Sequence, residues 1–366
     1  MRLLGEADLE DLATGAAVLG TGGGGNPYIG KLLAQRAIRE YGPVTLVGVD
    51  EVADDALVVP TAMMGAPTVS VEKLPRGDEL VRAFKTLEEY LGRSITHTVS
   101  IEAGGMNSTT PLTVAAQLRI PLVDGDGMGR AFPELQMVTP TLFGISATPM
   151  VIADEKGNTV LLTTIDNRWT ERLARSITID MGASAMIALY VLTGKQLKES
   201  IVPGTIGLAQ ELGRTIRVAR SAHGDPVRAI TERLRGHRIF EGKIVDVQRR
   251  TEAGFAKGEA RLSGLGSSAD ASLVLRFQNE YLVAIRDGEI ICSVPDLIIV
   301  LGSETGAPIT TDELRYGFRV TVIAAPCDPK WRSDAGLALV GPRYFGYDID
   351  YQPIEQRVGV GGQAEG

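Results

Sequence analysis

Residues 96–127 read THTVSIEAGGMNSTTPLTVAAQLRIPLVDGDG, which places an apolar strand, a glycine-rich turn, a short helix and a second strand in succession. The strands are expected at 96–101 and 120–123, and the helix at 111–118. Two strands joined through a helix pair in parallel, because a parallel connection needs a crossover. Each strand ends in a polar turn, and such turns gather at one edge of a parallel sheet. The segment therefore predicts an α/β fold with its functional loops at that edge.

The same alternation continues on both sides of this segment. Strands are expected upstream at 44–49 and 56–62, with an amphipathic helix at 78–91. The sequence is strongly helical from about residue 169 to about residue 212, and from Ile239 onward short strands and turn signals dominate. We therefore predict an N-terminal α/β domain with a mostly parallel sheet (residues 1–170), a helix-plus-β-rich C-terminal domain (171–352) and a flexible tail (353–366).

The composition excludes several classes of protein. Hydrophobic residues make up 44% and charged residues 22% of the 366, as in packed globular chains. The formal net charge of −8 argues against a nucleic-acid partner. No apolar run approaches the ~20 residues of a membrane helix, and Glu6 and Asp8 precede any run of signal-peptide length. With two cysteines and no disulfide framework, we expect a cytoplasmic homo-oligomer that acts on a small molecule.

Four consecutive glycines interrupt the sequence in the loop Gly20–Pro27, between two expected helices. One interpretation is an anion cradle, in which exposed backbone N–H groups and the start of the next helix meet a carboxylate or phosphate. The other is a tight corner between the helices. The loop lacks the Gly-Lys-Ser/Thr of a Walker A motif and follows a helix, unlike a dinucleotide-binding loop. The residues alone favour neither interpretation.

Acidic residues follow the two strands of the opening segment. Glu102 can bond a ligand amide or hold a metal, while Asp124 and Asp126 can share a divalent cation or provide a base. Aspartates in such loops also bond their own backbone. Asn107 is equally a candidate helix N-cap. Glu72, in a glycine-proline loop, is a further acidic candidate, although an isolated carboxylate is more often solvated.

Cys327 is the candidate for chemistry in the C-terminal half. It follows an apolar strand and precedes Lys330 and Arg332, whose charges favour the thiolate. A thiolate is a soft metal ligand or a nucleophile. The alternative is a thiol that fills space near Trp331. Cys292 lies within an expected strand and has the character of a buried residue.

Several segments resemble one known family in the same order along the chain. They are Gly20–Pro27, Gly65–Glu72, Glu102–Asn107, Val123–Glu134, Phe277–Glu280, Pro295–Ile298 and Gly341–Asp348. The chain resembles the S-methyl-thiohydantoin desulfurase family, which is associated with hydantoinase/oxoprolinase-type enzymes. The resemblance extends over nearly the whole chain, and the string 124–134 is its most specific part. It implies an N-terminal and a C-terminal domain.

The resemblance implies hydrolysis of a hydantoin-like ring, in which water attacks the carbon that bears an S-methyl group and methanethiol leaves. A divalent metal such as zinc would activate the water, although three histidines are few for a zinc site. The alternative is a non-catalytic, ligand-binding accessory subunit of a hydantoinase/oxoprolinase-type partner. On the enzyme interpretation the assigned residues are Glu72, Glu102, Asp126 and Cys327 for catalysis, Gly23, Gly24, Asn26, Asn107 and Arg130 for substrate binding, and Asp124, Asp126 and Cys327 for the metal.

Overall fold

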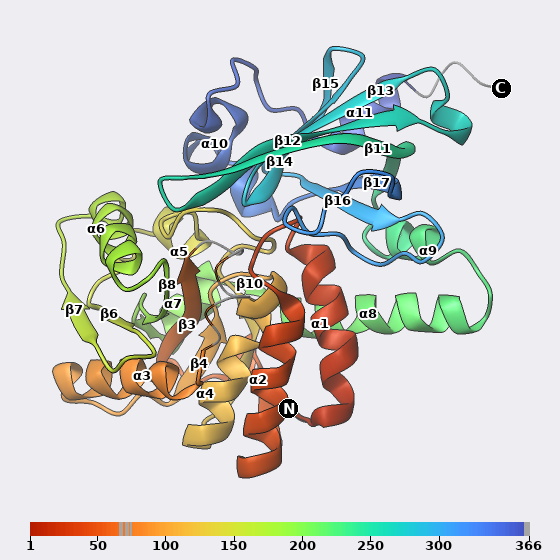
Figure 1. The fold of residues 1–366 in the computed structure, drawn as a ribbon. Helices are drawn as coiled ribbons and strands as arrows, with labels where there is room; N and C mark the ends of the chain where they lie inside the picture. The colour runs from red at the N-terminus through yellow and green to blue at the C-terminus, as the bar shows by residue number, and fades with distance from the viewer. Residues whose placement is uncertain (66–68, 70–72, 74, 362–366) are drawn as a thin grey trace.

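The computed structural model describes residues 1–65, 69, 73 and 75–361. Glu72, one of the candidate catalytic residues, lies outside these described residues. Figure 1 shows a lower α/β part, built mainly from the first half of the chain, and a second sheet that lies across its top.

The lower part contains one mixed sheet. Its strands are β1 (Arg2–Leu4), β2 (Val44–Gly48), β3 (Leu57–Gly65), β4 (His97–Ser100), β5 (Leu122–Asp126), β6 (Met150–Ala153), β7 (Thr159–Leu162), β8 (Ser184–Ala188), β9 (Leu192–Thr193) and β10 (Val202–Pro203). The order is β1-β2-β5-β4-β3-β8-β6-β7, with β10 beside β5 and β9 beside β3. Strands β2, β5, β4 and β3 are parallel, and the remaining strands join them antiparallel. The predicted α/β class is confirmed, and the strands after residue 170 extend the same sheet.

Helices cover both faces of this sheet. The helices of the described ranges are α1 (Leu9–Leu19), α2 (Pro27–Tyr41), α3 (Asp78–Leu91), α4 (Thr110–Leu118), α5 (Thr139–Leu142), α6 (Asn167–Asp180), α7 (Gly194–Ser200), α8 (Thr205–Ser221), α9 (Pro226–Arg233), α10 (Asp334–Val340) and α11 (Ile354–Gly361). Of these, α9 and α11 contact strands of the second sheet instead. Successive residues of a strand point to opposite faces. Val59 of β3 therefore packs with α3 and α4, whereas Val58 shares a core with α6 and α7. None of the helices in the described ranges combines the length and apolarity of a membrane crossing.

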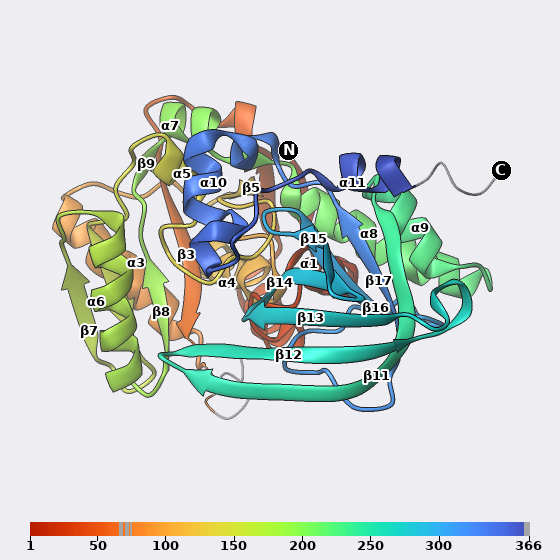
Figure 2. The ribbon, with the colours of Figure 1, turned by 90° about the horizontal axis from the view of Figure 1, so that it is seen from above.

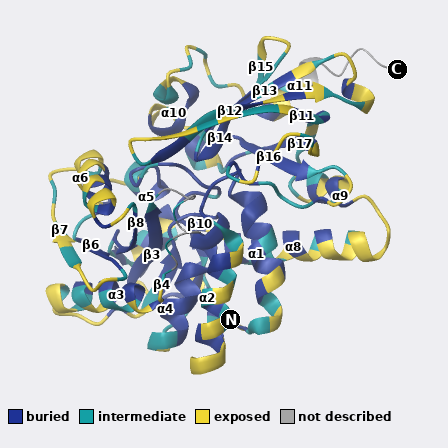
Figure 3. Cartoon of the chain, in the orientation of Figure 1, coloured by how far each residue is buried: buried dark blue, intermediate teal, exposed yellow. Residues whose placement is uncertain are grey.

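The second sheet is antiparallel throughout and forms half of a barrel. Its strands are β11 (His237–Glu252), β12 (Phe255–Gly264), β13 (Ser272–Gln278), β14 (Glu280–Arg286), β15 (Glu289–Ser293), β16 (Leu297–Gly302) and β17 (Arg319–Ala325). The order is β15-β14-β13-β12-β11-β17-β16, which confirms the predicted β-rich C-terminal part. Seen from above, the β11–β12 hairpin reaches across to α6 (Figure 2). Figure 3 shows that buried residues continue from the lower sheet into the upper one.

Two segments differ from the sequence-based expectation. Residues 184–188, expected within a helical region, form β8, which pairs with β3 on one side and β6 on the other. All five residues are buried, and a strand covered on both faces lacks the alternation that marks a strand in sequence. Residues 354–361, expected in a flexible tail, form α11, because Ile354 is buried and Arg357 Nη1 donates to the Ile290 carbonyl at 2.7 Å.

Candidate functional site

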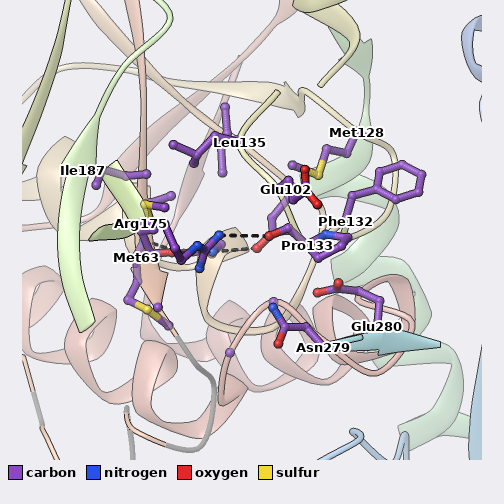
Figure 4. Close-up of a pocket in the computed structure, with 18 residues that line it drawn as sticks. Met63, Glu102, Met128, Phe132, Pro133, Leu135, Arg175, Ile187, Asn279 and Glu280 are labelled. Carbon is purple, nitrogen blue, oxygen red and sulfur yellow. Dashed lines mark hydrogen bonds between the residues drawn. The ribbon is translucent and has the colours of Figure 1, made fainter. Parts of the chain in front are cut away.

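A pocket lies where the ends of β3, β4 and β5 meet the β13–β14 turn of the upper sheet. About 530 Å³ of space free of protein atoms lies within and in front of it, and this space includes open solvent. Glu102, Arg175 and Glu280 are among its charged lining residues, and methionines and Phe132 form much of its apolar wall (Figure 4). Both halves of the chain therefore build this pocket.

Glu102 is held at the end of β4 by Asn107. The Asn107 side-chain N–H donates to Glu102 Oε1 at 2.6 Å, and Asn107 Oδ1 accepts from the Met63 backbone N–H at 2.7 Å. The Ser100 hydroxyl contacts the backbone carbonyls of Glu102 and Asn107 at 2.9 and 2.6 Å. Two residues that the sequence analysis selected are thus brought together. Asn107 acts as a bridge between β3 and Glu102, while the N-cap of α4 is Thr109.

Asp126 is fully buried, and its carboxylate binds backbone N–H groups of two loops, the one that contains Glu102 and the one that follows β5. Its carboxylate accepts N–H groups from Ala103 at 2.6 Å, Met128 at 2.8 Å and Gly129 at 2.9 Å. These bonds tie the turn after β4 to the turn after β5. Asp126 does not line the pocket. The structure therefore favours backbone bonding for Asp126 over a role as a cation ligand or a base.

Glu280 supplies a second carboxyl to the pocket from the upper sheet, and the sequence analysis did not select it as a site residue. The turn before it is fixed by Asn279, whose φ of 59° lies in the left-handed region that asparagine tolerates. Asn279 exchanges hydrogen bonds with Ala256 through its backbone and side chain. Glu280 is 2% exposed, and its Oε2 has no hydrogen-bond partner among the described residues. A buried, unsatisfied oxygen in a pocket wall marks a group available to a ligand.

Burial shifts the protonation of both carboxyls. It raises the pKa of Glu102 to about 7, with the hydrogen bond from Asn107 opposing the rise and the charge of Asp126 adding to it. The pKa of Glu280 is raised well above its usual value by burial and then by the charge of Glu102, with Arg130 opposing. Asp126 also has its pKa raised to about 7 by burial, against the backbone N–H groups that it accepts. Burial therefore favours the protonated form of both pocket carboxyls, and the hydrogen bond from Asn107 counters this effect at Glu102.

The glycine loop 20–27 is a corner between α1 and α2 that also receives the upper sheet. The Thr21 carbonyl accepts the Tyr281 N–H at 2.8 Å, and the Gly22 carbonyl accepts the Thr311 N–H at 2.9 Å. Gly24 borders the pocket, whereas Gly23 packs under Glu280. Asn26 caps α2 through bonds to the backbone of its first turn. The corner interpretation describes this loop, and its capping bonds occupy the Asn26 side chain that was predicted to bind substrate.

Gly23→Ala is expected to lower turnover by about 10²-fold, because misplacing a reacting group by about 1 Å costs that much. A Cβ at Gly23 would collide with the Glu280 carboxyl and side-chain carbons. Gly5→Ala is the matched control, since a Cβ there meets nothing closer than 4.0 Å. Steady-state kinetics and thermal unfolding of both variants check the prediction. Full activity in Gly23→Ala would show that the position of Glu280 is unimportant.

Arg130 is fully buried beside the pocket and does not line it. Its guanidinium donates to the carbonyls of Pro295 at 3.1 Å, Asp296 at 2.6 Å and Tyr281 at 3.2 Å. It also donates to the Thr21 hydroxyl at 2.8 Å. Arg130 was predicted to bind substrate, but these bonds direct its donors to the protein backbone, where they join the glycine loop to the upper sheet.

The residues predicted to hold a metal do not come together. Asp124 Oδ1 accepts the Gly207 N–H at the start of α8, while Asp126 bonds the loops near Glu102. An irregularity in the pairing of β4 and β5 matches Val99 with Val123 and Ser100 with Asp126. Strand β5 therefore carries two extra residues, Asp124 and Gly125, at this point. An i, i+2 spacing places two side chains on one face only in a regular strand. Within the described residues, no group of three His, Cys, Asp or Glu side chains is placed to hold a metal ion.

Cys327 lies apart from the pocket, in the core that also contains Trp331. Burial raises the pKa of its thiol to about 12, and the charge of Asp296 adds to this effect. Arg332 lowers the pKa of this thiol, as its charge predicts, but burial outweighs that effect and the thiolate is not favoured. The space-filling alternative fits its position.

Cys327→Ala is expected to leave kcat/KM within about twofold of wild type and to cost about 1 kcal/mol of stability. Cys327 is 5% exposed and contributes packing, and it is not among the residues that line the pocket. Turnover and urea unfolding of the variant provide the measurement. A loss of turnover at unchanged stability would restore Cys327 as a catalytic candidate.

Comparisons with known proteins give a family and a fold. Family models match both parts of the chain: the S-Me-THD-like N-terminal domain over residues 7–164 and the S-Me-THD-like C-terminal domain over residues 165–354. An X-ray crystal structure of a protein from Chromobacterium violaceum is similar, with a TM-score of 0.78 and 25% sequence identity, covering 97% of this chain and 100% of that one. The comparison with curated proteins gives no match.

Proposed function

The chain belongs to the S-Me-THD-like family, and we propose that its pocket hydrolyses an S-methyl-thiohydantoin or a similar small ring whose carbon–nitrogen double bond bears an S-methyl group, with release of methanethiol. The observation that carries the proposal is the pair Glu102 and Glu280, two buried carboxyls from different sheets that face one pocket. Their surroundings assign the roles. Glu102 accepts the Asn107 side-chain N–H, a bond that favours its ionised form, so it is the base. Glu280 Oε2 has no hydrogen-bond partner among the described residues and burial raises its pKa, so Glu280 is the acid.

The two carboxyls are sufficient to balance the proton transfers. Glu102 takes a proton from water as its oxygen bonds to the ring carbon that bears the S-methyl group. Glu280 protonates the adjacent ring nitrogen, so that the carbon–nitrogen double bond becomes single. When the carbon–sulfur bond breaks, Glu280 recovers a proton from the new hydroxyl, which becomes the carbonyl of the hydantoin. The proton on Glu102 passes to sulfur and methanethiol leaves. General acid–base catalysis of this kind contributes about 10²–10⁴-fold.

The rest of the lining suits a small, mostly apolar ring. Met63, Met128 and Phe132 border the pocket next to Glu102. Methionine side chains adapt to irregular shapes and make favourable sulfur contacts, which fits an S-methyl group. Asn107 keeps Glu102 oriented toward this wall.

The direct test is incubation of the purified protein with an S-methyl-thiohydantoin. Methanethiol, trapped with a thiol reagent, and the hydantoin, measured by mass spectrometry, are expected in equal amounts. The control is the same protein with both carboxyls replaced, Glu102→Gln and Glu280→Gln. Saturable binding without turnover would instead support the ligand-binding accessory subunit.

The rate of this reaction is expected to depend on pH in a bell shape. Glu102 must be ionised to accept a proton, so kcat/KM rises as the pH increases through about 7, the pKa of that carboxyl. Glu280 must be protonated, so the rate falls again at higher pH, where this raised pKa is passed. Initial rates across about pH 4–10, a range of about three units on either side of neutrality, measure both limbs. A rate that is flat through pH 7 would contradict the assignment of Glu102.

A further inference from the structure

We propose that Arg175 makes the pocket selective for rings that carry a carboxylate substituent. Arg175 comes from α6, and among the described residues that line the pocket it is the sole cation. The residue is 8% exposed. This inference names a substrate class for the proposed hydrolysis and rests on that proposed function.

Both halves of the chain hold the Arg175 guanidinium in place. Its Nε bonds Glu171 Oε1 at 2.7 Å, and Nη2 donates to the Pro133 carbonyl at 3.1 Å. The ring of Phe255, at the tip of the β11–β12 hairpin, lies 4.4 Å from the guanidinium carbon. Glu171 is itself fixed, because its Oε2 accepts the Leu135 N–H at 2.9 Å. A cation held this firmly has little freedom to lose when a ligand binds.

The guanidinium retains donors for a ligand. Arg175 has five N–H groups, and its Nη1 has no acceptor among the described residues. A buried ion pair is a weak source of stability compared with apolar packing. Arg175, which forms a buried ion pair with Glu171, lines the pocket, where a binding role explains it better than a gain in stability does. The planar fork of arginine matches a carboxylate in particular.

The position of Arg175 assigns the carboxylate to a substituent of the ring. In Figure 4, Arg175 enters from the side of Ile187 and Met63, whereas Glu280 and Phe132 lie on the opposite side of Glu102. The reacting carbon must lie between Glu102 and Glu280 to exchange protons with both. Arg175 therefore faces the substituent that the ring carries on the side away from Glu280.

A matched pair of substrates tests the inference. The two S-methyl-thiohydantoins carry a carboxymethyl or a carbamoylmethyl group, which have nearly the same shape and differ in charge. The wild type is expected to favour the acid by about tenfold or more in kcat/KM, mainly through KM. Arg175→Gln is expected to abolish this preference while still turning over the amide, and Arg175→Lys to retain part of it. Arg172→Gln, on the exposed side of the same helix, is the control.

Because Arg175→Gln leaves the Glu171 carboxylate buried without its partner, the double variant Glu171→Gln/Arg175→Gln is measured as well. Binding of the two corresponding hydantoins by calorimetry gives a readout that does not need turnover. An acid preference that is lost in both variants supports the inference. Equal affinity of the wild type for acid and amide overturns it, as does an equal loss for both ligands on Arg175→Gln. Acid-selective binding without turnover would reject the proposed hydrolysis and leave the carboxylate site in place.

Discussion

Glu102→Gln is expected to lower kcat by about 10²–10⁴-fold, the contribution of a general base, while the protein stays folded. Glutamine keeps the volume of the side chain, and its amide oxygen can still accept the Asn107 N–H that lies 2.6 Å from Glu102 Oε1. The base that takes the proton from water is lost. In the wild type, burial already disfavours the ionised carboxylate, so the neutral amide causes no further strain.

Turnover measured by methanethiol release and the midpoint of thermal unfolding separate the two effects in Glu102→Gln. Glu134→Gln provides a matched control, since Glu134 lines the same pocket and bonds the Tyr344 hydroxyl at 2.7 Å. We expect it to change kcat by no more than about threefold. Glu280→Gln should also lose activity and remove the alkaline limb of the pH profile. Near-normal kcat in Glu102→Gln would mean that another group activates the water.

Arg130→Met is expected to have the largest effect on stability, a loss of about 3–5 kcal/mol, because each buried acceptor left without a donor costs about 1–3 kcal/mol. The substitution leaves the carbonyls of Tyr281, Pro295 and Asp296 without the guanidinium donors that reach them. Methionine fills similar space, so the loss reports hydrogen bonding more than packing. Arg130 is 0% exposed, so water cannot replace the missing donors at the surface.

Urea unfolding of the wild type and Arg130→Met measures this loss. Arg276→Met serves as the control, because Arg276 is exposed on the upper sheet and is paired with Glu259 at 3.4 Å. Exposed pairs contribute about 0–1 kcal/mol. If Arg130→Met is no less stable than Arg276→Met, the junction between the two sheets does not depend on this arginine.

The sequence predicts the half of the site that lies within one strand–helix–strand unit, formed by β4, α4 and β5. Residues 96–127 predict two strands whose ends meet, and the structure brings Glu102 and Asn107 together there. Asp126 lies nearby but is used by the backbone. The spacing of Asp124 and Asp126 suggests a shared ligand only if the strand is regular, and the irregular pairing at β5 cannot be inferred from residue types.

The other half of the site depends on contacts between distant segments. Glu280 follows Asn279 at a hairpin turn, where a carboxylate is usually solvated, and only the docking of Gly23 against it reveals its burial. The prediction of a thiolate at Cys327 rests on Lys330 and Arg332, its neighbours in sequence. Its environment in the fold is the core around Trp331. Arg130 likewise looks like a ligand-binding cation until its acceptors, more than 100 residues away, are known.

On the proposed mechanism, the two carboxyls come from different sheets, so activity reports whether the two sheets have assembled. Glu102 is in place once β4 and β5 have paired, but Glu280 reaches it only when the β13–β14 turn has settled on the glycine loop. On this mechanism, a nascent or partly refolded chain has no activity, even when its lower sheet is fully formed. During refolding from urea, turnover should return with the last cooperative phase, while far-ultraviolet circular dichroism recovers earlier.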